Sequence, residues 1–141
     1  MEELFALRAA LEEHRYADAF AILGELEEMS KDDKIEKIYS YMVILLLNLI
    51  KQHAEQRTTR SWELSIHESV KKIRRINKRR KSGGHYLTQS ELKENLTDAY
   101  SSALKMASLE AFSGQYTEDQ LAQKVDKENL EKIALALILE N

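Results

Sequence analysis

The chain has 141 residues, a formal net charge of −3 at pH 7, four glycines, and neither cysteine nor proline. This length suits one domain over residues 1–141, and the absence of cysteine excludes disulfides, thiolate metal ligands and a cysteine nucleophile. The scarcity of helix-breaking residues favours helices. The longest apolar run, Met42 to Leu47, is too short to cross a bilayer, and the acidic N-terminus lacks the basic region of a signal peptide, so we expect a cytoplasmic protein.

The charge is distributed unevenly along the chain. Residues 1–36 hold 11 acidic and 4 basic residues, whereas residues 51–81 hold 11 basic and 3 acidic ones. We expect the acidic helices to pack beside the basic one and to neutralise part of its charge.

The first two predicted helices are short. Leu4, Leu7 and Leu11 recur at helical spacing, and Arg15-Tyr16 is predicted to open a connection. A second apolar stripe then runs from Ala19 to Leu26.

The next two predicted helices form a long central hairpin over residues 31–54 and 59–81. Ser30 is a typical N-cap for the first of them, and its residues 42–50 are apolar almost all round, which predicts a central position in the fold. The second helix follows a polar break and is predicted to end at Gly83-Gly84.

The remaining predicted helices begin at capping motifs. Thr88 with Glu91 and Thr117 with Gln120 form capping boxes, and Asp126 is a third N-cap. No segment shows sustained alternation of apolar and polar residues, so we predict no sheet. The pattern predicts an all-α, up-and-down bundle of five or six helices, with helix 88–112 packed against the hairpin.

The C-terminal segment over residues 133–139 is apolar on nearly every side. If one face of the bundle covers only part of it, the remainder predicts association as a homodimer or with a partner helix. The alternative is a C-terminal helix that the bundle wraps entirely.

Several blocks of the sequence form a recognisable pattern. They are Leu45-Leu46-Leu47-Asn48-Leu49-Ile50-Lys51, Thr59-Arg60-Ser61-Trp62-Glu63-Leu64-Ser65-Ile66, the set Tyr100, Ala103 and Glu110, and Tyr116-Thr117-Glu118-Asp119-Gln120-Leu121. These blocks resemble those of the domain of unknown function 29 family, which is common in cyanobacteria. The resemblance covers most of the chain and implies an all-helical fold without an assigned activity.

The chain also departs from this family pattern. It has Asn48 where the family usually has histidine, Gln52 where it has tryptophan, and Ser113-Gly114-Gln115 in place of a proline-containing stretch. The resemblance therefore implies no histidine-based role at these positions.

Arg60 and Trp62 are the most distinctive candidates for a ligand or partner site. The competing interpretation is structural, because Thr59 or Ser61 would cap a helix, Trp62 would anchor the core, and Arg60 would pair with an acid or pack over an aromatic ring.

A basic run provides a second candidate site. Eight of the eleven residues from Lys71 to Lys81 are basic, and Lys71, Arg74, Arg75 and Lys78 share one helix face, with Arg79 following them. Such a stripe suits nucleic acid or an anionic surface, whereas a solvated or acid-paired face is the alternative.

The histidines define the only catalytic hypotheses. Glu63 with His67 is the nearest match to a metal-binding Glu-x-x-His pair, and no second copy accompanies it. Arg60 with His67, or Arg80 with His85, has the arginine–histidine spacing of HEPN ribonucleases. The sequence otherwise holds no convergent catalytic set, so we expect a non-catalytic interaction or structural module without a cofactor or metal.

Overall fold

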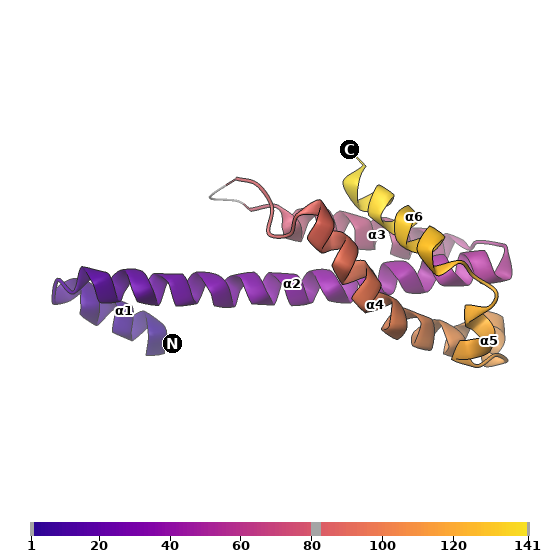
Figure 1. Ribbon diagram of the computed structural model, residues 1–141, viewed down its shortest axis with the longest axis horizontal. Coiled ribbons are helices and arrows are strands. Elements are labelled where there is room, and N and C mark those ends of the chain that lie inside the picture. The colour runs from indigo at the N-terminus through magenta and orange to yellow at the C-terminus, as the bar shows by residue number, and fades with distance from the viewer. Residues whose placement is uncertain (1, 80–82, 141) are drawn as a thin grey trace. The chain divides into compact units, whose positions relative to one another are not determined.

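The structure is a computed structural model that describes residues 2–79 and 83–140. Its elements are α1 (Glu2–Glu12), α2 (Tyr16–Glu55), α3 (Arg60–Asn77), α4 (Gln89–Glu110), a 3-10 turn (Ala111–Gly114), α5 (Glu118–Ala122) and α6 (Lys127–Leu139) (Figure 1). The described residues contain no β-strand, only an isolated antiparallel bridge between Lys78 and His85. The predicted all-α bundle is thereby confirmed. No helix in this part of the chain is long and apolar enough to cross a membrane.

The chain divides into two compact units, Met1–Lys34 and Ile35–Asn141, and α2 contributes to both. The first unit holds α1 and the beginning of α2, and the second holds the remainder of α2 with the other helices. The proposal of one domain over residues 1–141 stays a prediction.

The predicted helix start at Ser30 is wrong, because Ser30 lies inside α2. A good N-cap residue begins a helix only where the preceding chain leaves the helical conformation. No proline stands before Ser30, and strong helix formers flank it on both sides, so the helix runs through it. The first arm of the central hairpin accordingly starts at Tyr16. The predicted end of the second arm, at residue 81 before Gly83-Gly84, is also wrong: α3 ends at Asn77, and Lys78 takes an extended backbone conformation.

In the first unit, α1 and the start of α2 form an antiparallel helical hairpin (Figure 1). The turn between them places His14 in the left-handed region with φ 58°, and the Arg15 N–H donates to the Ala10 carbonyl at 2.8 Å. Ala10 and Ala19 are both buried. Their small side chains let the two helices approach closely.

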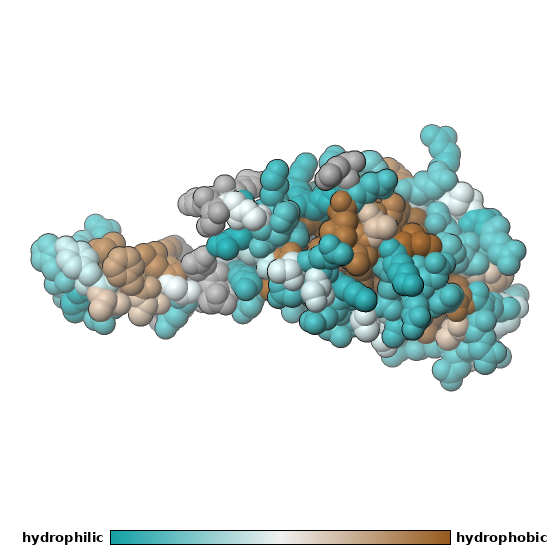
Figure 2. Space-filling view, turned by 45° about the horizontal axis from the view of Figure 1, so that its top comes forward, coloured by the Kyte–Doolittle hydropathy of each residue, from teal (hydrophilic) through white to brown (hydrophobic). Residues whose placement is uncertain are grey.

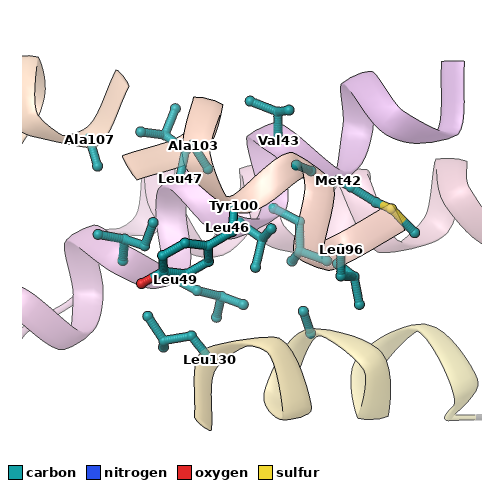
Figure 3. Close-up of a cluster of buried hydrophobic side chains, with 14 of the residues drawn as sticks. Met42, Val43, Leu46, Leu47, Leu49, Leu96, Tyr100, Ala103, Ala107 and Leu130 are labelled. Carbon is teal, nitrogen blue, oxygen red and sulfur yellow. The ribbon is translucent and has the colours of Figure 1, made fainter. Parts of the chain in front are cut away.

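In the second unit, the core is built mainly from α2, α4 and α6 (Figure 3). Its largest fully buried side chains are Ile38, Met42, Leu45, Leu46, Ile50, Ile73, Leu96, Leu121 and Leu130. Most of the α2 segment 42–50 is buried, as predicted from its apolar residues on nearly every side of the helix. Ile44 is its most exposed member. Each fully buried leucine or isoleucine contributes about 1.5–3 kcal/mol of hydrophobic stabilisation.

The predicted caps of the later helices are confirmed. Thr88 with Glu91 and Thr117 with Gln120 form complete capping boxes, and the Asp126 side chain accepts from the Asn129 N–H. Each cap satisfies N–H groups that the first helical turn leaves without partners. These caps fix where α4, α5 and α6 begin.

The C-terminal helix α6 packs against α4 and α3. Leu130, Ala134 and Ile138 are buried along one stripe, and Leu139 at its end remains 42% exposed. The neighbouring positions Ile133, Leu135 and Leu137 are partly buried against the core. Most of the apolar surface of this helix is therefore used within the bundle, and association through its remainder stays a prediction.

Tyr100 carries a polar group into the core without satisfying it. Its side chain is buried, and its hydroxyl has no hydrogen-bond partner among the described residues. Burial raises the pKa of Tyr100 to about 12, with the carboxylates of Glu131 and Asp126 adding to the effect. The hydroxyl therefore costs stability, because it gives up water without gaining a partner.

We expect Tyr100→Phe to raise the free energy of unfolding at pH 7 by up to about 1 kcal/mol, since it removes this unsatisfied hydroxyl. A tyrosine in the unfolded chain ionises near the ordinary pKa of 10.0, whereas Tyr100 in the folded protein has a pKa of about 12 and keeps its proton longer. Stability is thus lost as the pH rises from 10 towards 12, and less steeply in Tyr100→Phe. Urea unfolding across this range measures both effects, and a loss of stability at pH 7 would contradict the first.

Candidate functional site

The Arg60-Ser61-Trp62 block lies where α2 turns into α3. Thr59 caps α3, its hydroxyl accepting from the Trp62 N–H at 3.1 Å. The Trp62 ring has the Arg57 guanidinium 4.7 Å and the Lys51 ammonium 5.1 Å from its centroid. Arg60 itself is exposed and lines a shallow hollow with Ser61, Glu63 and Leu64. The cations over the tryptophan are therefore Arg57 and Lys51, and Arg60 contributes to a separate surface.

The same corner contains a left-handed turn that a carboxylate stabilises. Phe112, Ser113 and Gly114 all have positive φ angles, of 51°, 58° and 77°. The Glu55 carboxylate accepts from the Phe112 N–H at 3.1 Å and from the Arg57 guanidinium at 2.8 Å. A side chain at Gly114 would place its Cβ 3.1 Å from the Leu109 carbonyl oxygen, so glycine suits both the angle and the space.

A partly buried ion pair connects α2 to the end of α4 beside this turn. The Lys51 ammonium donates to the Glu110 carboxylate at 3.2 Å, and the Lys51 side chain is 8% exposed. Next to the turn, the Phe112 and Tyr116 rings meet edge to face with their centroids 5.0 Å apart. Lys51, Trp62, Glu110 and Tyr116 belong to the blocks that carry the family resemblance, and the structure brings them together in one corner.

We expect Glu55→Gln to lower the free energy of unfolding by about 1–2 kcal/mol at pH 7, because it removes the charge from two hydrogen bonds. Burial raises the pKa of Glu55, but the Phe112 N–H and the Arg57 guanidinium outweigh it and hold the pKa below its ordinary 4.5. The stabilisation is thus present above pH 4.5 and lost as the pH falls through the lowered pKa.

Chemical denaturation of wild type and Glu55→Gln between pH 3 and 7 measures this contribution, with Glu68→Gln on the exposed surface of α3 as control. The two curves for Glu55 should converge towards low pH. A constant gap across the range would show that the charge of Glu55 contributes nothing.

The residues of the basic run differ in their surroundings: some are exposed, and others contact neighbouring parts of the protein. Lys71, Arg75 and Lys78 are exposed and, at spacings of four and three residues, lie along one stripe. Arg74 instead turns to the C-terminus of α6, where its guanidinium donates to the carbonyls of Ile138 at 2.8 Å and Leu137 at 2.7 Å. The Arg79 guanidinium lies 5.7 Å from the centroid of the Tyr86 ring.

Arg80 and Lys81, the last residues of the run, lie outside the described residues. We call Lys71, Arg75 and Lys78 the basic stripe.

A cavity of about 550 Å³ lies where α3, the start of α4 and the end of α6 meet. Arg74, Lys78 and His85 line it together with Gln89 of the first turn of α4, whose dipole favours an anion. Glu140 also lines the cavity and opposes an anion there. The lining of this cavity therefore combines two permanent cations, Arg74 and Lys78, with one carboxylate.

Two of the histidines lie together in one cavity. His53 and His67 line one cavity of about 470 Å³ with Glu63, across the α2–α3 hairpin. No three His, Asp or Glu side chains in the described ranges are grouped so as to hold a metal ion. Arg60 lines the hollow described above and His67 lines this cavity, with Glu63 bordering both. The second pair includes Arg80, which lies outside the described residues.

The first unit presents a feature that the sequence analysis missed, an exposed apolar surface on the hairpin. Phe5 is 70% and Phe20 73% exposed, the highest values among the large apolar residues of this unit. Figure 2 shows apolar atoms gathered over α1 and the beginning of α2. We call this surface the hairpin patch. It consists of Leu4, Phe5, Leu11, Tyr16, Phe20 and Leu23.

Helix geometry places five of the six members on one side of the hairpin, whereas Phe5 points about 100° further round α1 than Leu4 and lies at the edge of the patch. Leu4 and Leu11 are two turns apart on α1, and Tyr16, Phe20 and Leu23 share a stripe of α2. Each stripe is rotated by roughly a quarter turn, in the same sense, from the buried alanine of its helix. Because the helices run antiparallel, the same sense of rotation brings both stripes to one side of the hairpin.

The sequence contained a signal for this patch. The helix starting at Tyr16 has two apolar stripes, one through Ala19, Ile22 and Leu26 and another through Tyr16, Phe20 and Leu23. Because α1 is a single short helix, it covers only the first, and the second is left exposed. A comparison of the number of apolar stripes on this helix with the number of helices able to cover them would have predicted an exposed apolar face.

These features define an all-α protein with an apolar patch on one unit and a basic stripe on the other. The domain of unknown function DUF29 matches residues 6–134, so the chain belongs to that family. No curated protein and no solved structure matches the chain. Two of the residues that depart from the family pattern make hydrogen bonds: Asn48 is buried and donates to the Ile44 carbonyl at 2.9 Å, and Gln52 donates to the Thr58 hydroxyl at 2.6 Å.

Proposed function

We propose that this DUF29 protein is a non-catalytic interaction module that binds an amphipathic helix of a partner protein through the hairpin patch. The observation that carries the proposal is the exposure of six large apolar side chains within residues 4–23. A surface of this kind is costly in water and marks an interaction site when it is continuous. Its two phenylalanines and its tyrosine are the large rigid side chains that anchor protein interfaces.

The patch has the form that a third helix would cover. Two antiparallel helices with apolar stripes on one side accept a helix laid over them, as helix-binding proteins do with anchors spaced three, four and seven residues apart. The resulting three-helix arrangement would bury both stripes. The patch holds apolar side chains rather than reactive groups, which favours binding over catalysis.

Selection from a library of helical peptides tests this proposal. The wild-type protein is the target, and a Phe5→Gln, Phe20→Gln variant removes peptides that bind elsewhere. We expect enrichment of peptides with one apolar stripe that bind wild type at least tenfold more tightly than the variant. Leu109→Gln, at a 75% exposed leucine of α4, is the matched control and should bind as wild type does. Peptides that bind all three proteins equally would reject the hairpin patch as the site.

A second candidate function, binding of polyanions, is favoured by the basic stripe. Lys71 and Arg75 are exposed on α3, and Lys78, which follows the helix directly, is exposed and borders the 550 Å³ cavity. Such a row attracts phosphates without reading sequence, and its affinity falls with salt. Titrating the protein with DNA, RNA and acidic vesicles at low salt tests it, with a Lys71→Gln, Arg75→Gln variant as comparison. Absence of binding at low salt would reject this function.

A further inference from the structure

We infer that the helix recognised by the hairpin patch is basic: an amphipathic helix with an apolar stripe flanked by lysine or arginine. This inference rests on the proposed function and adds the charge of the partner. It follows from the charges of the unit that carries the patch and from the chemistry of its exposed rings.

The unit around the patch is strongly acidic. Residues 1–34 contain ten acidic and four basic residues, for a net charge of −6. Two of the four bases are already paired within the unit, because Arg8 bonds Glu12 at 3.1 Å and Arg15 lies 2.7 Å from Glu13 and 2.9 Å from Asp18. These internal pairs leave the net charge unchanged. A partner surface placed on the patch therefore meets a negative potential.

The same charge disfavours a second copy of the hairpin as the occupant. Two such units brought face to face would each carry a charge of −6, and acids beside the contact would approach one another within the screening length of about 8 Å at physiological salt. A basic helix instead gains from every acid that it approaches, and the long stems of lysine and arginine can lie over apolar surface while their charges reach outwards.

The aromatic members of the patch point to the same partner chemistry. Phe5, Tyr16 and Phe20 are each more than half exposed. Lysine and arginine bind to the faces of such rings through cation–π interactions, which acidic side chains cannot make. Within the second unit, the cations around Trp62, Phe112 and Tyr116 already show this pairing. A basic amphipathic helix thus suits the apolar area, the rings and the surrounding charge together.

Three synthetic helical peptides of equal length test the inference on the full chain. The first has a leucine stripe flanked by lysines, the second has the same leucines flanked by glutamates, and the third has the composition of the first in scrambled order. We expect the lysine peptide to bind at least tenfold more tightly than either of the others. Its affinity should fall when salt is raised and should fall at least tenfold in Phe20→Gln, with Leu4→Gln as a second variant on α1.

Leu109→Gln should leave binding of the lysine peptide unchanged, and circular dichroism establishes that each variant is folded. If the glutamate peptide binds as tightly as the lysine peptide and both are weakened by Phe20→Gln, the inferred charge is wrong while the docking surface stands. If Phe20→Gln and Leu4→Gln affect no peptide, the docking surface is rejected as well. Concentration-dependent self-association of wild type that Phe20→Gln abolishes would show that a second copy is the occupant.

Discussion

Arg74→Ala is expected to lower the free energy of unfolding by about 3 kcal/mol, because it removes two charge-assisted hydrogen bonds in a half-buried setting. The Arg74 guanidinium donates to the last carbonyls of α6, those of Leu137 and Ile138. These groups have no partners within their own helix, and they carry the negative end of its dipole. Urea unfolding followed by circular dichroism measures the loss.

Arg75→Ala is the matched control, since Arg75 is the next residue on α3 and is exposed. Its effect should stay within about 0.5 kcal/mol, as is usual for surface positions. Arg74→Lys should be intermediate, because an ammonium cannot reproduce the fork of a guanidinium. Equal losses for Arg74→Ala and Arg75→Ala would show that the contact with α6 contributes nothing to stability.

This pair of variants also separates structure from binding within the basic run. Arg74 shares a helix face with Lys71 and Lys78 in the sequence pattern, so composition alone assigns it to a phosphate-binding stripe. In the structure, the end of α6 lies against that face, and Arg74 donates its hydrogen bonds to α6. Sequence spacing therefore identified the helix face, but it could not show that α6 would pack against Arg74.

Features that depend on neighbouring residues could be predicted from the sequence, whereas contacts between distant residues could not. Capping boxes at Thr88 and Thr117 depend on residues three positions apart, so the chain itself specifies them. The corner that joins Lys51 to Glu110 depends on residues 59 positions apart. The left-handed turn at Phe112 likewise needs Glu55 from a distant helix. Local patterns predicted the helices and the caps, whereas the contacts between helices required the fold.

The hairpin patch shows a related point about exposed apolar residues. The sequence pattern placed the association surface on the C-terminal helix because that segment is the most apolar. Burial depends on how many neighbours a helix has, and α6 packs against both α4 and α3. Phe20 belongs to a less apolar segment, yet it remains 73% exposed because nothing in its own unit covers its stripe. Hydrophobicity alone thus ranks candidate interfaces poorly when the number of packing partners differs.

Leu96→Ala should lower the free energy of unfolding by about 2–5 kcal/mol, the range for a buried leucine that leaves a cavity. Leu96 is fully buried on α4 and packs within the cluster formed with α2 (Figure 3). Leu109→Ala makes the same substitution on the same helix at a 75% exposed site, and should cost less than about 0.5 kcal/mol.

The comparison of these two leucines isolates burial, because helix propensity changes equally in both. The urea dependence of stability should stay the same, since both variants expose a similar surface on unfolding. Similar losses at the two positions would mean that α4 does not pack on α2 as described. In that case the Lys51–Glu110 pair and the turn held by Glu55 would have no fixed partner either, because both depend on where α4 ends relative to α2.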